Sequence, residues 1–85
     1  MAIKACGWVE LIEEVDGLIA VDLAVSNLAG ETHHSVRAGE FAPNAAPADV
    51  RAVLVLFVRD YVASAMGVTF DAGDDVALWP PPGAI

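Results

Sequence analysis

One segment of the chain repeats its hydrophobic residues at the spacing of an α-helix. Between Pro47 and Met66, apolar side chains recur every three or four residues, which places them on one helical face. Pro47 suits the first helical position, Asp49 places a negative charge where the helix dipole favours it, and Gly67 suits a left-handed C-terminal cap. The pattern predicts a helix of about five turns whose buried face is formed by Val50, Leu54, Phe57, Tyr61 and Val62.

A second pattern, nearer the N-terminus, predicts a β-hairpin. Trp8–Val15 and Leu18–Ser26 flank Asp16-Gly17, a dipeptide typical of tight hairpin turns. A two-residue loop would set carboxylates among the apolar residues, whereas a three-residue loop ending at Gly17 pairs odd positions with odd positions. Because a slip of one residue turns a whole face outward, the pattern favours the three-residue loop. The shared apolar face would then contain Val9, Leu11, Val15, Ile19, Val21, Leu23 and Val25.

Weaker patterns fill the remainder of the chain. Thr32–Arg37 is predicted to be a third strand with Thr32, His34 and Val36 on one side, and residues 39–46 a connector anchored by Phe41. After the helix, Val68–Asp71 and Val76–Trp79 alternate like short strands. We therefore expect an α+β fold, a small antiparallel β-meander packed on one long α-helix, in the order β-β-β-α-β with one or two final strands. Residues 1–79 would form a single domain and residues 80–85 a proline-rich C-terminal arm.

Size and composition indicate association with other protein. A chain of 85 residues has room for one small core, which leaves little net stability. The single Cys6 excludes an internal disulfide, and we interpret it as a small apolar residue in a terminal segment that frays. Yet 56% of the residues are hydrophobic and the mean hydropathy is +0.56. Either these additional apolar residues form a contact surface for other protein, or the chain is rich in alanine and valine because it comes from a GC-rich genome.

The charge excludes several classes of partner. Twelve carboxylates against four basic side chains give a net charge of −8, which argues against binding to nucleic acid or to an anionic membrane. The longest apolar run, residues 52–58, is far shorter than the roughly 20 residues that span a bilayer. Acidic residues also interrupt the N-terminal segment where a targeting signal would lie. We expect a soluble protein that is made in the reducing cytoplasm and is not secreted by the general pathway.

The reactive side chains form no recognisable catalytic or metal motif. His33 and His34 are adjacent in a predicted strand, so they point to opposite faces and cannot bind one ion. Asp71, Asp74 and Asp75 lack the spacing of a calcium-binding loop. The sequence also contains no phosphate-binding glycine loop and no nucleophile elbow. We therefore predict a protein that is not an enzyme, with no catalytic residue, cofactor or metal.

Several apolar residues fall outside the predicted core. Ala52, Leu56 and Ala63 form a stripe on the opposite side of the helix, either a second contact face or a set of good helix formers. The three prolines of the arm make it stiff, and it is either a docking segment or a frayed terminus. The predicted partner interface consists of Trp8, Ile12, Leu56, Trp79, Pro80, Pro81, Pro82 and Ile85.

The acidic chain with its hairpin, its helix P-A-D-V-R-A-V-L-x-L-F-V-R-D-Y-V and its proline-tipped tail resembles small structural proteins of tailed-bacteriophage particles. The resemblance covers roughly residues 8–66 and rests on general pattern, so no functional residue is carried over. It implies a non-enzymatic capsid, head–tail or tail component that assembles with copies of itself or with other structural proteins and is incorporated in a virion. The alternative is a small acidic inhibitor that occupies a basic site on a host enzyme.

Overall fold

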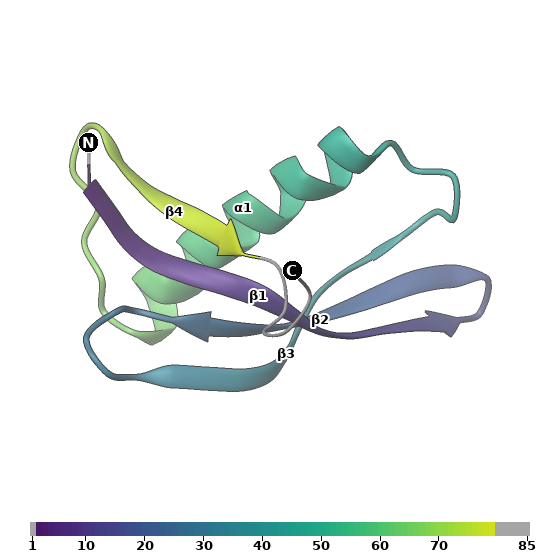
Figure 1. Ribbon diagram of the computed structural model, residues 1–85, viewed down its shortest axis with the longest axis horizontal. Coiled ribbons are helices and arrows are strands. Elements are labelled where there is room, and N and C mark those ends of the chain that lie inside the picture. The colour runs from purple at the N-terminus through teal and green to yellow at the C-terminus, as the bar shows by residue number, and fades with distance from the viewer. Residues whose placement is uncertain (1, 80–85) are drawn as a thin grey trace.

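Four strands and one helix make up the computed structural model, which describes residues 2–79. The sheet has the order β3-β2-β1-β4, in which β1, β2 and β3 pair antiparallel and β4 pairs parallel to β1. Figure 1 shows the helix crossing one face of this sheet diagonally. The α+β class and the order β-β-β-α-β are therefore confirmed, with one strand after the helix. The elements are β1 (Ala2–Val15), β2 (Leu18–Ser26), β3 (Thr32–Phe41), α1 (Pro47–Ala65) and β4 (Asp74–Trp79).

Helix α1 agrees with the sequence prediction to within one residue at each end. It begins at Pro47 and carries Asp49 in its first turn. At its C-terminal end the Val62 carbonyl accepts hydrogen bonds from the N–H groups of Met66 and Val68, at 3.2 and 3.1 Å. Gly67 lies between these two donors with a φ of 67°, the left-handed conformation that the cap requires. No helix within residues 2–79 has the length and apolarity needed to cross a membrane.

The core lies between α1 and the helix-facing side of the sheet. Val58 occupies its centre, fully buried, directly over Gly7 of β1. A Cβ on Gly7 would lie 2.8 Å from the Val58 Cγ2 atom, so only glycine lets the helix approach this closely. Phe57, predicted to lie on the buried face, is instead half-buried at its margin and stacks on Tyr61. The core consists of Ala5, Val21, Leu23, Val25, Leu54, Val58, Val62 and Val76.

The predicted three-residue hairpin loop is wrong. Val15 pairs directly with Leu18, which leaves a two-residue turn of Asp16 and Gly17. Both turn residues have positive φ, 53° and 81°, as a type I′ turn requires. The local preference of Asp-Gly for this turn thus prevails, although it pairs even positions of β1 with odd positions of β2.

A β-bulge further along the hairpin corrects the resulting mismatch. Glu10 has no opposite residue on β2, and the register shifts by one between Val9 and Leu11. Beyond the bulge Val9 faces Leu23, so the odd positions of both strands now share the helix side. The chain therefore keeps the favoured turn and the apolar pairing, at the cost of one irregular residue.

The bulge also changes which side chains of the hairpin end face the helix. Ile12 and Glu14 lie opposite Val21 and Ile19, and therefore stand on the helix side of the sheet. Leu11 and Val15, predicted to point inward, stand on the other side, opposite Asp22 and Leu18. The predicted apolar face is right for Val9, Ile19, Val21, Leu23 and Val25 and wrong for these two.

Strand β1 is longer than predicted because it is covered at its start by β4. Ala2–Trp8 pairs in parallel with Asp74–Trp79, with an irregularity at Lys4. Cys6, expected in a fraying segment, instead lies in the middle of this pairing and is buried. Burial raises the pKa of the Cys6 thiol above its ordinary value.

Two other predictions about local structure are corrected. Strand β3 extends to Phe41 instead of ending at Arg37. A register shift beside Ser35, whose φ is 56°, puts His33 and not His34 on the helix side with Val36. Residues 68–71, predicted to form a strand, are irregular, although Val68 and Phe70 still pack against the core.

Candidate partner-binding site

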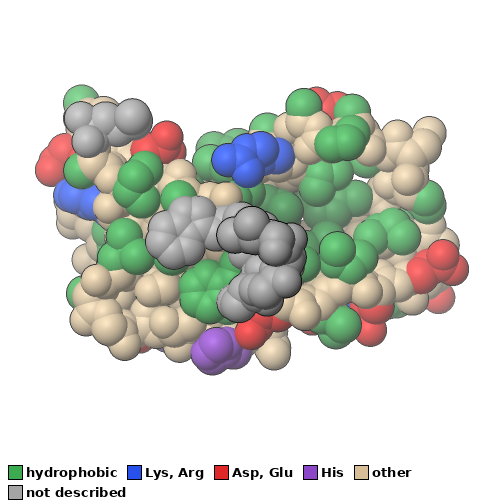
Figure 2. Space-filling view, in the orientation of Figure 1, with side chains coloured by type: hydrophobic (Ala, Val, Ile, Leu, Met, Phe, Trp, Pro, Cys, Tyr) green, Lys and Arg blue, Asp and Glu red, His purple; other side chains and the backbone are tan. Residues whose placement is uncertain are grey.

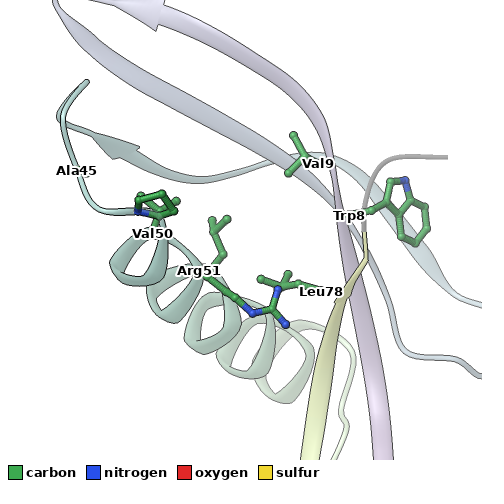
Figure 3. Close-up of a pocket in the computed structure, with 8 residues that line it drawn as sticks. Trp8, Val9, Ala45, Val50, Arg51 and Leu78 are labelled. Carbon is green, nitrogen blue, oxygen red and sulfur yellow. The ribbon is translucent and has the colours of Figure 1, made fainter. Parts of the chain in front are cut away.

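An open groove of about 570 Å³ lies between the N-terminal half of α1 and strand β1. Figure 3 shows Val9 and Leu78 on the side of their strands that faces the helix, whereas the indole of Trp8, at the border of the groove, points away from the helix. Among the described lining residues, Arg51 carries the one charge, so the groove is largely apolar. It is lined by Trp8, Val9, Ala45, Pro47, Val50, Arg51, Leu54 and Leu78.

The groove is open because the helix and the hairpin diverge. The first turns of α1 rise away from the sheet while the hairpin β1–β2 continues past them, and residues 42–46 bridge the gap (Figure 1). Figure 2 shows hydrophobic side chains in this recess between helix and hairpin. The apolar surface of Val9 and Val50 is therefore only partly covered by the protein's own packing.

Beside the groove, β1 presents an unpaired edge. Strand β4 ends at Trp79, which pairs with Trp8, and within residues 2–79 no strand covers β1 beyond that point. The next three residues of the sequence are prolines, which have no N–H and cannot continue a β-ladder. Among the described residues, positions 9–15 of β1, here called the free edge, thus pair with β2 on one side alone.

The free edge presents specific backbone groups to solvent. Because Val15 and Leu18 close a two-residue turn, their pair is hydrogen-bonded, and bonded pairs alternate along an antiparallel ladder. The N–H and C=O groups of Val15 and Glu13 therefore point to β2, and those of Glu14 and Ile12 point outward. The Ile12 side chain is 61% exposed on the groove side of the same strand.

The other edges of the sheet are less suited to pairing. Strand β3 is interrupted by register shifts near Ser35 and Ala38 and carries Arg37 and Glu40, features that discourage added strands. Strand β4 has only six residues and begins with two aspartates. The free edge is therefore the longest unprotected stretch of strand among the described residues.

Charges on the far side of the sheet compensate one another. The guanidinium of Arg37 contacts the carboxylates of Asp22, Glu13 and Glu40. Hydrogen bonding to Asp22 raises the pKa of Arg37 above its ordinary value. Glu13 of the free edge is thus engaged within its own chain. Glu14 makes no ion pair with the described residues, and its carboxylate remains available at the edge.

Glu10 links its own bulge to the irregularity in β3. One carboxylate oxygen accepts the Ser35 backbone N–H at 2.7 Å, and the other lies 2.8 Å from His34 Nδ1. The hydrogen bond from Ser35, and then that from His34, lowers the pKa of Glu10 below its ordinary value. Two register shifts on strands separated by β2 are therefore stabilised by one side chain.

A chain of hydrogen bonds joins His33 to the helix. His33 Nδ1 lies 2.7 Å from the Tyr61 hydroxyl and Nε2 lies 2.8 Å from a Glu31 carboxylate oxygen. Because an ionised carboxylate only accepts, Nε2–H donates to Glu31, and Nδ1 shares a hydrogen bond with the Tyr61 hydroxyl. None of the three residues lines the groove, so this contact fastens β3 to α1.

The aspartate turn that precedes β4 is held by a lysine. Lys4 Nζ lies 2.9 Å from Asp74 and 3.6 Å from Asp71, and donates to the Thr69 carbonyl at 2.8 Å. The hydrogen bond to Asp74 raises the pKa of Lys4, and the same bond lowers the pKa of Asp74. Within residues 2–79, no cluster of three histidine, cysteine or acidic side chains has the geometry of a metal site.

The structure brings together some of the residues predicted to form an interface. Trp8 borders the groove and Ile12 lies on the free edge, whereas Leu56 is 61% exposed on the opposite side of α1. Trp79 is the last residue of β4, paired with Trp8. Pro80, Pro81, Pro82 and Ile85, and with them the predicted arm, lie outside the described residues.

The sequence prediction missed the groove and the availability of Glu14. Both depend on where β4 stops beside β1, a contact between residues about 70 positions apart. The signal that could have indicated them is the run of prolines after Trp79, which sets the length of the covering strand.

Comparisons with protein-family models, with curated proteins and with solved structures found no match to this chain.

Proposed function

We propose that this chain is a non-enzymatic assembly subunit that binds other protein through the groove and the free edge. The observation that carries the proposal is an apolar groove lying directly beside unpaired strand backbone. Either feature alone is common, but together they offer main-chain hydrogen bonds and a pocket for side chains to one extended segment. Leu56, on the far side of α1, supplies a second exposed apolar position for contact.

The setting of this assembly follows from the resemblance of the hairpin and helix pattern to small structural proteins of tailed bacteriophages. We propose a particle component of the capsid, the head–tail junction or the tail. The distribution of acidic groups supports assembly over inhibition of a basic enzyme site. The carboxylates without a described ion pair are spread over the hairpin turn, both ends of the helix and β4, and do not form one face: Glu14, Asp16, Asp49, Asp60 and Asp75.

Size-exclusion chromatography with light scattering tests this function on the full chain, alone and mixed with the products of neighbouring genes. Ala45→Glu places a charge on the groove wall, and Ala29→Glu places the same charge on the exposed β2–β3 turn as a matched control. We expect the wild type and Ala29→Glu to form an assembly that Ala45→Glu does not form. Monomers in every mixture, or an assembly that Ala45→Glu leaves intact, would reject the proposal.

A further inference from the structure

We infer that the free edge accepts an extended segment of a partner protein in which basic residues alternate with apolar ones. The segment adds a strand to β1 and places apolar side chains in the groove. This inference rests on the proposed function and specifies the partner's chemistry. It follows from three properties of the site: its backbone, its apolar wall and its charge.

The backbone offers a short ladder. The outward N–H and C=O groups of Ile12 and Glu14 supply four positions for hydrogen bonds to an added strand. The neighbouring bulge at Glu10 ends the regular stretch, because Glu10 has no opposite residue on β2. The site therefore fits an extended segment of a few residues.

The apolar wall gives the added strand a preferred face. Ile12 stands on the helix side of β1, the side on which Val9, Val50 and Leu78 line the groove. Alternate side chains of an added strand point to that same side. Every second residue of the partner segment should therefore be apolar.

The negative charge of the protein favours basic residues at the positions between the apolar residues of the partner segment. The free edge and turn bring Glu14 and Asp16 close to the site without an ion pair to the described residues, on a chain with a net charge of −8. Glu14 stands on the helix side with Ile12, so lysine or arginine between the apolar residues of the partner segment points to the other face of the sheet. There it complements the net negative charge of the chain at long range and speeds the encounter.

The two occupants that the chain itself could supply fit less well. A second copy pairing through the same edge would bring the sequence Val9–Val15 with three more glutamates, and a further net charge of −8. The segment after β4 begins with Pro80, Pro81 and Pro82, which have no N–H to donate to Ile12 and Glu14. A strand from another protein that carries basic residues supplies both the opposite charge and the backbone N–H groups.

Peptide titration of the full chain, followed by backbone NMR, tests the inference. The probe is a peptide of about nine residues in which lysine alternates with valine. Its controls are a glutamate–valine peptide, a lysine–valine peptide N-methylated at alternate residues, and the peptide Pro-Pro-Pro-Gly-Ala-Ile. We expect the lysine–valine probe to shift the amide signals of Val9, Ile12 and Glu14. N-methylation should weaken its binding about tenfold through lost backbone hydrogen bonds, and the glutamate–valine peptide should not bind.

Two variants locate the contact on the protein. Glu14→Pro removes one outward N–H without touching the ladder to β2, and should weaken the probe about tenfold. Glu14→Gln keeps the N–H, and should weaken the probe less, by an amount that vanishes at high salt. If Glu14→Pro does not fold, the N-methylated peptide still decides whether backbone pairing holds the probe.

Several results would overturn the inference. No shift at millimolar probe, equal binding of the acidic or N-methylated peptide, or shifts confined to β3 would each do so. Tighter binding of the proline peptide would assign the site to the chain's own tail, and Ile12 and Glu14 signals that depend on protein concentration without peptide would assign it to a second copy. None of these peptide results changes the outcome of the assembly experiment with Ala45→Glu, so the proposed function is tested separately.

Discussion

The close approach of Val58 to Gly7 gives the sharpest prediction about stability. Adding one methyl group in Gly7→Ala would place a Cβ 2.8 Å from Val58 Cγ2. Valine in a helix has essentially one χ1 rotamer, so it cannot turn away, and the helix must lift instead. We expect Gly7→Ala to lower the free energy of unfolding by about 1–3 kcal/mol, the usual cost of overpacking.

Shortening the side chain at position 58 should relieve that clash. Val58→Ala alone removes two buried methyl groups, which costs about 1.6 kcal/mol of transfer free energy and about 1 kcal/mol for the cavity. In the double variant the new methyl at position 7 fills part of the space left at position 58. The double variant should therefore be about 1–2 kcal/mol more stable than the sum of the two single losses.

Urea denaturation followed by circular dichroism measures these differences. A domain of 85 residues has a total stability of about 4–13 kcal/mol, so each single loss is measurable. Val62→Ala is the matched control, because Val62 is equally buried on the same helix face and lies farther than Val58 from a Cβ at position 7. Additive effects of Gly7→Ala and Val58→Ala would show that helix and sheet are not packed as described.

Three further predictions concern single features. The folded-state pKa of Glu10 is lowered, so its contribution is present above the ordinary carboxyl value of 4.5 and is lost as the pH falls below it. The stability difference between wild type and Glu10→Gln in urea titrations should shrink over that acidic range, and a constant difference would contradict this. Leu56→Glu should change the melting temperature little and reduce the assembled mass in light scattering. Deleting residues 80–85 should weaken assembly at an unchanged melting temperature, and full assembly of the truncated chain would exclude a role for the arm.

The helix could be predicted from the sequence because its signals are local. Pro47, the three-and-four spacing of valines and leucines, and Gly67 lie within 21 residues and agree with one another. Local agreement does not identify the centre of the buried face, however. Val58 takes that place, because Gly7, far away in the sequence, provides room for it.

The hairpin could be predicted in part. The Asp16-Gly17 signal correctly predicts a hairpin. With a constant register, however, a two-residue turn and an apolar face shared by both strands exclude each other, so the prediction kept the apolar face and gave the wrong turn. The protein satisfies both with the bulge at Glu10. That bulge is stabilised by Ser35 and His34, which no window around the hairpin contains.

The start of β1 and the candidate site could not be predicted because they depend on β4. At the start of β1 the residues that face the helix, Ala5 and Gly7, are too small to form an apolar pattern. They adopt strand structure because they pair with Val76 and Leu78. The free edge exists because β1 continues after β4 has stopped. The sequence predicted Trp8 and Ile12 as interface residues because they fall outside the predicted core. It did not predict the unpaired strand backbone beside them.

Amide hydrogen exchange, compared between the isolated chain and the assembly, tests most directly whether partners bind at the free edge. In the isolated chain the amides of Glu13 and Val15 should be protected by β2, whereas those of Ile12 and Glu14 should exchange freely. In the assembly Ile12 and Glu14 should become protected. Protection gained elsewhere, with Ile12 and Glu14 still exchanging freely, would contradict the account.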